Sequence, residues 1–398
     1  MPIKFKIVEK ILLLLIILLG AFIYLHKLST NPPGLYIDEV GTGYNAYSIL
    51  MTGKDEYGKA FPLSFRLFGS YTPPLQVYFS IPLIAIFGLS AFSIRLLSVI
   101  CGVLLIPIVF LILKDLDFIK SKFTSIIVTL FFAITPWLVF FSRLGYEQNL
   151  AFLFFSLSIL MVLKSLKNPK LLVFTLPLIS LTTYTDYPQR FLSPIIFIGI
   201  LAIFRKIFLQ KKYFRHILIG LLISLLIQIP NLYLLTTPSF FAKTDRFYLD
   251  VVVSQSKTIN KLLPMFIAYP LAFVREFLSK YLTYFSPRSL FFLPDSDPQR
   301  SIPELSVFYF WMLIPYLTGL YFIWKNRANT KIKLIFFLLL ITPLTGALTK
   351  DPFHVQRTLA LVLPLTIVIA VGIDHLIYKL KVKVLLVTIA GFLIISLV

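Results

Sequence analysis

Long apolar segments alternate with short polar segments along almost the whole chain. A helix that crosses a bilayer needs about 20 mainly apolar residues, and on this basis the sequence predicts about eleven membrane spans. Their approximate ranges are 8–28, 92–113, 123–141, 149–163, 171–185, 191–204, 217–235, 306–324, 334–348, 358–378 and a last span ending at 398. The last span ends without a polar tail, which suggests a truncated C-terminus. The predicted fold is all-α, a polytopic transmembrane helical bundle.

The polar segments between the spans are of two kinds. Lysine-rich segments fall on one side of the predicted bundle: 114–122, 164–170, 205–216, 325–333 and 379–383. Segments that mix acids, Tyr, Arg, His and Pro fall on the other side: 142–148, 185–190 and 350–357. Because short cytoplasmic loops carry an excess of Lys and Arg, we expect the N-terminus and the lysine-rich side to be cytoplasmic. The mixed segments would then lie on the outer face of a cell membrane.

This orientation depends on how one ambiguous segment is interpreted. Residues 75–89 are apolar, but they are few for a span and contain Pro82. A full crossing there would put the 114–122 lysines outside, so an interfacial helix is the better interpretation. The aromatic-rich segment 262–284, with Arg275, Glu276 and Lys280, predicts a second interfacial helix. The chain is thus expected to form one domain, 1–398, with a first outer loop at 29–91 and a long outer loop at 236–305.

Composition excludes several classes of protein. The chain has 58% hydrophobic residues and a mean hydropathy of +0.89, which excludes a soluble globular protein. The net charge of +21 lies in short clusters between spans, which indicates membrane orientation and no nucleic-acid partner. The one cysteine, Cys101, leaves no intramolecular disulfide and no Cys-rich metal site. No small-residue cleavage site follows the basic, apolar N-terminus, so residues 1–28 are interpreted as the first membrane anchor.

The first outer loop carries two adjacent acids, Asp38 and Glu39. One interpretation is structural: Asp38 caps an interfacial helix from Glu39 to Thr52, which Gly53 ends. The other is that one of the two carboxylates is a general base at the membrane surface. The two interpretations are compatible, because a cap would also fix the position of the carboxylate, and the residues alone do not say which of the two acids removes a proton.

Five outer segments carry a resemblance to a known family. They are SYTPPL (70–75), SRLGYEQNL (142–150), YTDYPQRFLSP (184–194), YFSPRSLFFLPDSDPQR (284–300) and HVQRTLALVLP (354–364). Their order and their common side resemble membrane glycosyltransferases of the GT-C fold, in the branch of the protein O-mannosyltransferases and the lipid A aminoarabinose transferases. Tyr71 and Thr72 depart from the aminoarabinose branch, which carries acidic and basic residues there, so the sugar is not inferred.

The resemblance implies transfer of one sugar from a polyprenyl-phosphate donor to a hydroxyl of a lipid, glycan or protein acceptor, with inversion. By this resemblance Asp38 is the catalytic base, and Glu39 beside it is a second catalytic candidate. Glu147 is another outer carboxylate, which either orients the acceptor or pairs with Arg143. A phosphate leaving group needs positive charge more than an acid. The candidate substrate-binding residues are Tyr44, Lys59, Tyr71, Arg143, Arg190, Arg288, His354 and Arg357.

The same resemblance bears on metals. Related oligosaccharyltransferases hold a metal between acids of the first and second outer loops, usually with a paired acidic motif, whereas Glu147 stands alone here. We therefore expect no metal and no cofactor. Two other pairs of acids are not interpreted as metal sites. Asp115 and Asp117 lie among the lysines of the side expected to be cytoplasmic. Asp295 and Asp297 lie between two prolines and are expected to form a turn.

Two other functions are compatible with a polytopic membrane chain. A transporter of lipid-linked sugars would place charged groups near the bilayer midplane, often in related repeats, and no repeat is visible. A non-catalytic membrane assembly protein would leave the outer acids and bases as surface residues. The acceptor and the oligomeric state stay open.

Overall fold

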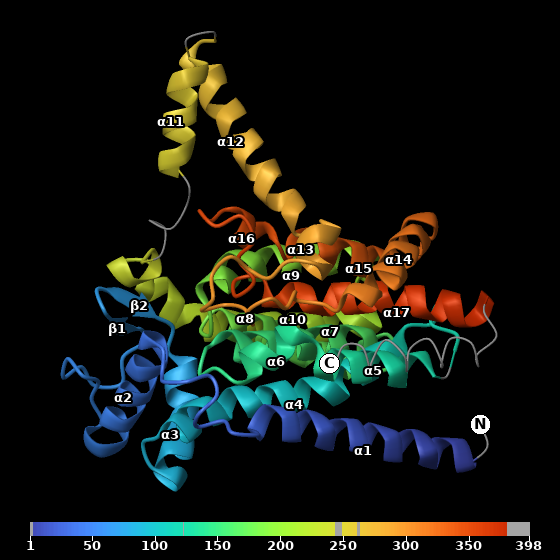
Figure 1. Cartoon of the computed structure of the whole chain (residues 1–398), viewed down its shortest axis with the longest axis horizontal. Coiled ribbons are helices and arrows are strands. Elements are labelled where there is room, and N and C mark those ends of the chain that lie inside the picture. Colours follow the sequence, from blue (N-terminus) through green and yellow to red (C-terminus); the bar gives the residue numbers. More distant parts are fainter. Residues whose placement is uncertain (1–2, 122, 243–248, 261–262, 380–398) are drawn as a thin grey trace.

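The computed structural model describes residues 3–121, 123–242, 249–260 and 263–379. Most of the helices lie side by side and form one bundle along the long axis of the molecule (Figure 1). They are α1 (Ile3–Leu25), α4 (Ala91–Asp115), α5 (Thr124–Ile134), α6 (Pro136–Ser142), α7 (Gln148–Ser165), α8 (Leu172–Thr182), α9 (Tyr187–Phe208), α10 (Lys211–Leu234), α14 (Leu313–Lys325), α15 (Thr330–Ile341), α16 (Leu344–Ala347) and α17 (Val362–Lys379).

The remaining elements lie outside the bundle. In the first outer loop they are α2 (Ile37–Thr52), the strands β1 (Phe65–Leu67) and β2 (Ser70–Thr72), and α3 (Leu75–Phe87). In the long outer loop they are α11 (Leu249–Ile259), α12 (Met265–Thr283) and α13 (Pro287–Phe291). The strands pair antiparallel, with Phe65 opposite Thr72. The all-α transmembrane fold predicted from the apolar segments is confirmed.

The number of spans is smaller than expected among the described residues. Seven helices there are long and apolar enough to cross a membrane, or eight if α5 and α6 count as one span bent by 52°. The bend falls at Pro136, which has no N–H to donate and clashes with the preceding turn. The expected spans at 171–185 and 306–324 contain only the short helices α8 and α14, and the last one lies outside the described residues. About eleven spans is therefore not confirmed.

The first outer loop has the expected helix but not the expected cap. The helix α2 ends at Gly53, which takes the left-handed conformation with φ 70°, as predicted. Asp38 is not its cap, however, because Tyr36 occupies that position and Asp38 lies within the first turn. The side chain that serves this helix end is Glu39, whose Oε2 accepts from the Tyr36 N–H at 2.9 Å. The prediction failed because it started the helix two residues too late.

The helix predicted over 262–284 in the long outer loop is present as α12, and its position at the membrane interface stays a prediction. The sequence did not predict α11, which packs against α12 as a hairpin. Figure 1 shows this hairpin projecting from the body, crosswise to α1, α4 and α17. It leaves from the half of the body that also carries α2, β1 and β2.

The two ends of the bundle differ in the way the sequence predicted. Asp115 pairs with Lys164 and Lys167, at 2.8 and 3.2 Å, and Asp117 pairs with Lys331 at 3.4 Å. These contacts bring three lysine-rich segments together, and they account for both acids as ion-pair partners. The side of the membrane on which this end lies stays a prediction.

The core of the bundle is densest where α14 crosses α17. A Cβ at Gly319 would collide with the carbonyl oxygen of Val368, and a Cβ at Gly372 with that of Pro315. The two backbones therefore approach as closely as only glycine permits, a common device where helices pack within a membrane.

Gly319→Ala and Gly372→Ala should each destabilise the folded chain by about 1–3 kcal/mol, because a backbone cannot move aside as a side chain can. Gly20→Ala is the matched control, since its Cβ would collide only with the far end of the flexible Ile106 side chain. Thermal unfolding in detergent checks this. Equal melting temperatures for all three variants would contradict the close crossing.

Candidate active site

Glu39 is fully buried at the end of the bundle that carries the first outer loop. Its Oε1 accepts from Arg95 Nε at 2.9 Å and from the Gly145 N–H at 2.7 Å. Its Oε2 accepts from Arg95 Nη2 at 3.2 Å and from the Tyr36 N–H at 2.9 Å. Four hydrogen bonds thus hold this carboxylate, and they join the first outer loop to the start of α4 and to the second outer loop, residues 142–148.

Arg95 completes the anchor from α4 and is also fully buried. Its Nη1 donates to the carbonyls of Leu28 and Pro32, both at 2.9 Å, and its Nη2 donates to that of Gly34. Gly145 closes the contact from the other side, where a Cβ would lie 2.8 Å from Cγ2 of Ile94. A charge within an apolar span is a strong signal in a membrane chain, and Arg95 is a residue that sequence reasoning should have selected and missed.

Arg143 also holds the backbone at the start of the first outer loop. Its guanidinium donates to four carbonyls at the end of α1 and the start of the first outer loop: Ile23, Tyr24, His26 and Asn31. The pairing with Glu147 considered from the sequence is therefore not what this guanidinium does. Arg95 and Arg143 together fix the path of the chain that leads to α2.

Asp38 precedes Glu39 in the same helical turn and is exposed. Consecutive residues of a helix lie about 100° apart, so burying Glu39 turns Asp38 outward. In the described part of the chain its carboxylate has no hydrogen-bond or ion-pair partner. It lines a polar cavity of about 300 Å³ together with Tyr146, Asp297, Gln299, Arg300, Thr349, Lys350, Asp351, His354, Gln356 and Arg357.

Four separate stretches of chain meet at this polar cavity. They are the start of α2, the second outer loop, the end of the long outer loop and the loop after α16. Gln356 Nε2 donates to Gln148 Oε1 at 3.3 Å and so links the second and last of the outer loops. Glu147 is buried next to Tyr146. Of the candidates from the sequence, the structure brings together Asp38, His354 and Arg357, with Glu147 close by.

The charges of the cavity are partly balanced within its wall. Arg300 pairs with Asp351 at 2.7 Å, Asp295 at 3.2 Å and Asp297 at 3.3 Å. The turn predicted at Asp295 to Asp297 is confirmed by the Asp297 N–H, which donates to Asp295 Oδ1 at 3.0 Å. That turn forms part of the wall, a position the sequence did not indicate. Burial raises the pKa of Asp295 above its ordinary value.

Tyr146 places a hydroxyl beside Asp38. Burial, and after it the negative charges of Asp38, Glu39 and other nearby groups, raise the pKa of Tyr146 well above its ordinary value. Its hydroxyl therefore stays protonated near neutral pH and can donate a hydrogen bond into the cavity. The motif SRLGYEQNL drew attention to Glu147, and Tyr146 beside it was missed.

Arg357 also borders a second cavity of a different kind. This apolar groove, of about 290 Å³, lies between the start of α9 and α16. Besides Arg357, it is lined by Tyr187, Pro188, Phe191, Leu192, Ile195, Phe240, Phe241, Leu344, Thr345 and Leu348. Arg357 thus stands where an apolar compartment meets a polar one, which is the arrangement that an amphipathic ligand requires.

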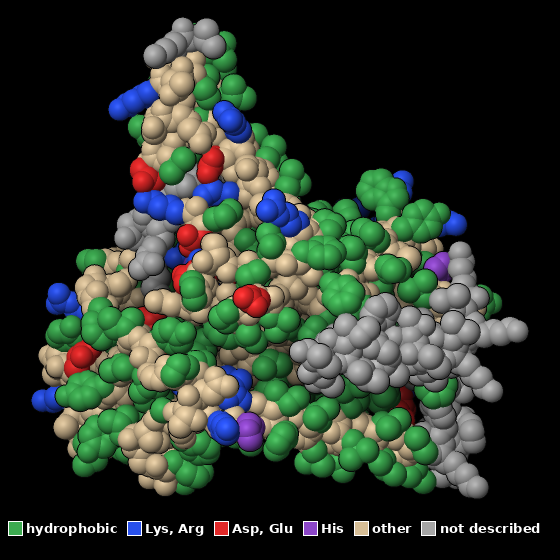
Figure 2. Space-filling model, in the orientation of Figure 1, with side chains coloured by type: hydrophobic (Ala, Val, Ile, Leu, Met, Phe, Trp, Pro, Cys, Tyr) green, Lys and Arg blue, Asp and Glu red, His purple; other side chains and the backbone are tan. Residues whose placement is uncertain are grey.

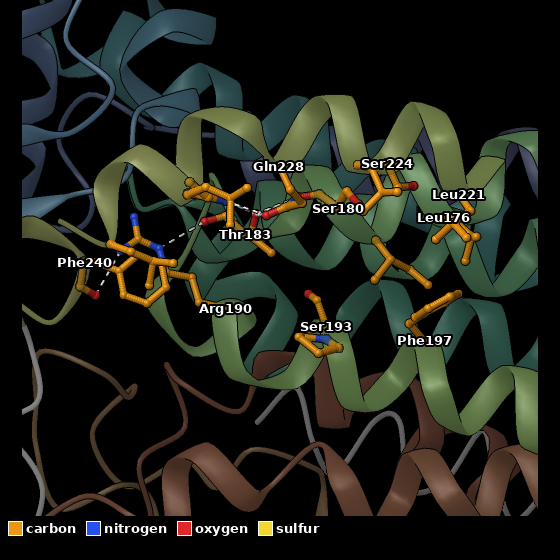
Figure 3. A pocket seen from close by; sticks show the side chains of 16 residues that line it. Leu176, Ser180, Thr183, Arg190, Ser193, Phe197, Leu221, Ser224, Gln228 and Phe240 are labelled. Carbon is orange, nitrogen blue, oxygen red and sulfur yellow. Dashed lines mark hydrogen bonds between the residues drawn. The ribbon is translucent and has the colours of Figure 1, made fainter. Parts of the chain in front are cut away.

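Arg190 lies near this groove but outside the polar cavity. Its guanidinium stacks on the rings of Tyr187 and Phe240, 4.5 and 4.9 Å from their centres, and donates to the Phe240 carbonyl at 3.1 Å. It closes one end of a third cavity, of about 280 Å³, between α8, α9 and α10 (Figure 3). Thr183 and Gln228 form hydrogen-bonded polar contacts along that cavity.

The other candidates are not brought together. Tyr44, Lys59 and Arg288 are exposed and do not line the polar cavity, and Tyr71 is half-buried in β2 opposite Arg66. Among the described residues, no three His, Cys, Asp or Glu side chains are grouped as a metal ion would need. The expectation that the protein needs no metal and no other cofactor stays a prediction.

Comparison with known proteins agrees with the motifs. A family model described as dolichyl-phosphate-mannose-protein mannosyltransferase matches residues 71–234. The structure of ArnT from Cupriavidus metallidurans bound to undecaprenyl phosphate has a TM-score of 0.59 at 12% identity, over 100% of this chain and 64% of that one. The oligosaccharyltransferase AglB from Archaeoglobus fulgidus, in complex with an inhibitory peptide and a dolichol-phosphate, has a TM-score of 0.57 at 15% identity, over 97% and 54%. No curated protein sequence matches the chain.

The chain therefore has the GT-C fold of membrane glycosyltransferases, and the expected resemblance to the branch that contains ArnT and the protein O-mannosyltransferases is confirmed. It spans 64% of the length of the ArnT structure and about half of the AglB structure.

Arg95→Met should destabilise the fold by about 3–5 kcal/mol, because it leaves Glu39 buried without its counter-charge. Lys114→Met is the matched control, since it breaks the partly exposed pair with Glu9 and should cost at most about 1 kcal/mol. Thermal unfolding in detergent measures both. An Arg95→Met variant as stable as the control would show that the buried pair does not hold the outer loops together.

Proposed function

We propose that this chain is a membrane glycosyltransferase that moves one sugar from a polyprenyl-phosphate donor to an acceptor hydroxyl on the outer face. The observation that carries the proposal is one juxtaposition. A carboxylate without a partner among the described residues, Asp38, faces a cavity with Lys350, His354 and Arg357, and Arg357 also borders the apolar groove. The GT-C fold supports the same reaction class.

The donor would lie across the boundary between the two cavities. The apolar groove suits part of an isoprenoid chain, and the polar cavity suits the sugar and the phosphate. Arg357 is suited to the phosphate because its planar fork can donate to two oxygens at once. The similar structures are consistent with this class of ligand, since ArnT was solved with undecaprenyl phosphate and AglB with a dolichol-phosphate.

The chemistry requires a base and a stabilised leaving group. The acceptor oxygen attacks the anomeric carbon while Asp38 takes its proton, and the bond from that carbon to the carrier phosphate breaks. The electron pair leaves with the phosphate, where Lys350, His354 and Arg357 can stabilise the negative charge. Attack opposite the leaving group inverts the anomeric configuration. Glu39 takes no part, because its four hydrogen bonds occupy both oxygens.

Tyr146 and Glu147 would serve the acceptor. Tyr146 lines the cavity next to Asp38, and its hydroxyl can donate to a sugar or acceptor oxygen. Glu147 follows directly in the chain and is buried, so its carboxylate can orient neighbouring groups without facing open solvent. The product that carries the transferred sugar identifies the acceptor, since lipid, glycan and protein hydroxyls react alike.

The test is release of free polyprenyl phosphate from a panel of polyprenyl-phosphate sugars by the purified chain in native lipid extract. Release from at least one donor, with the sugar recovered on a lipid, glycan or protein, is the expected result. A chain that moves donors across the bilayer without releasing carrier would be a transporter, and the proposed function would be wrong. The same panel identifies the sugar.

Transfer should continue unchanged in excess EDTA, because the proposed mechanism relies on the charges of the protein and requires no bound ion. The rate of carrier release with and without EDTA measures this, with subsequent addition of Mg²⁺ or Mn²⁺ as the control. Loss of transfer in EDTA that either ion restores would contradict metal independence and would leave the assignment of the reaction class intact.

A further inference from the structure

One side of α12 is bare and apolar. Five aliphatic side chains at spacings of three and four residues, here termed the α12 stripe, share this side, and each is 43% to 60% exposed. They are Ile267, Leu271, Val274, Leu278 and Leu282. Figure 2 shows hydrophobic side chains along the edge of the hairpin that is turned away from α11.

The other side of α12 is already occupied. Ala272 is fully buried and packs with Val252 of α11 in a small hydrophobic cluster that also includes Phe277 and Leu348. The stripe contributes nothing to this cluster. One face of α12 therefore packs against α11 and holds the hairpin together. The α12 stripe lies on the opposite face and has no protein cover among the described residues.

The direction of the hairpin indicates what covers it. The hairpin extends crosswise to the long helices α1, α4 and α17 (Figure 1). Because such helices cross a bilayer, a helix crosswise to them runs along the membrane surface. Amphipathic helices in that position bury their apolar face at the boundary between headgroups and acyl chains. Arg275, exposed one position beyond Val274, can extend to lipid phosphates at the edge of the stripe.

We propose that the α11–α12 hairpin docks through the α12 stripe on the phospholipid surface beside the polar cavity. A protein partner fits less well, because a specific protein interface buries about 800 Å² on each partner, and one row of half-exposed aliphatic side chains provides much less. Exposed apolar residues of the candidate spans, such as Leu14 and Leu18 of α1, need the same kind of apolar cover, and a bilayer supplies it to any helix that crosses it.

The docked helix also holds a wall of the polar cavity. Lys280 lies about 200° around the helix from Leu278, so it points away from the stripe. Its Nζ donates to the carbonyls of Thr349, at 3.0 Å, and of Lys350. From α11, Asp250 pairs with the Lys350 ammonium at 2.8 Å. Thr349 and Lys350 both line the polar cavity, so the lipid surface is connected to that wall through a single helix.

A spin label tests the docking without any assay of transfer. Because Cys101 is the one cysteine of the chain, Cys101→Ser with Leu278→Cys gives a single labelling site. The matched control is Thr258→Cys, an exposed position on α11. The labelled full chain is placed in phosphatidylcholine–phosphatidylglycerol nanodiscs, one chain per disc, and collisions with a water-soluble nickel chelate and with oxygen are measured.

The label at 278 should collide about ten-fold less often with the nickel chelate than the label at 258, and more often with oxygen, because it sits among lipids. Equal nickel collisions at both positions would overturn the proposal. The proposal would also be overturned if the label at 278 were protected from the nickel chelate only in discs that hold several chains. A second copy of the chain would then cover the α12 stripe.

A second measurement keeps the native cysteine. Leu271→Glu with Leu278→Glu should release the hairpin from the bilayer and make it several-fold more sensitive to added protease in nanodiscs. Ser254→Glu with Thr258→Glu adds the same charge to exposed positions of α11 and should leave sensitivity unchanged. Equal sensitivity of the two double variants would contradict docking, whether or not the chain transfers sugar.

Discussion

The buried ion pair between Glu39 and Arg95 is the constraint on which the end of the bundle with the candidate active site depends. Two charges without solvent contact lose several kcal/mol of solvation each, so the pair is tolerable only with near-complete hydrogen bonding. That condition is met: Glu39 accepts four hydrogen bonds, and Arg95 also donates to the carbonyl of Leu28 and to two carbonyls of the first outer loop. The pair fixes the first outer loop against α4 and against Gly145 of the second outer loop.

This anchor decides how the two adjacent acids differ. Once Glu39 is turned into the protein, the phase of the helix turns Asp38 outward into the polar cavity. One carboxylate then holds the structure and the other is available for chemistry. The same cavity receives Lys350 and Arg357 from the loop after α16, and α12 fixes the backbone of Lys350 through Lys280. Anchor, cavity and hairpin are therefore one connected arrangement.

Apolar length and the chemistry of proline and glycine predicted most of the helices, including the end of α2 at Gly53. The bend at Pro136 was missed because the span was assigned by its apolar length alone, although an internal proline is itself a signal for a bend. Sidedness placed the candidate residues at one end of the bundle, yet only tertiary packing decides which of them meet. Asp38, His354 and Arg357 do so, whereas Lys59 and Arg288 stay at the surface. Arg95 was overlooked because the apolar residues around it were enough to predict a membrane span, and its charge was not considered further.

The most direct measurement compares Asp38→Asn with Glu39→Gln, each assayed for carrier release and for thermal stability in the same lipid. The account predicts that Asp38→Asn loses at least about a hundred-fold in rate with an unchanged melting temperature, because the amide keeps the shape and loses the basicity. It predicts that Glu39→Gln lowers the melting temperature, because the carboxylate supports the buried pair. An Asp38→Asn variant that transfers sugar at the wild-type rate would contradict the account.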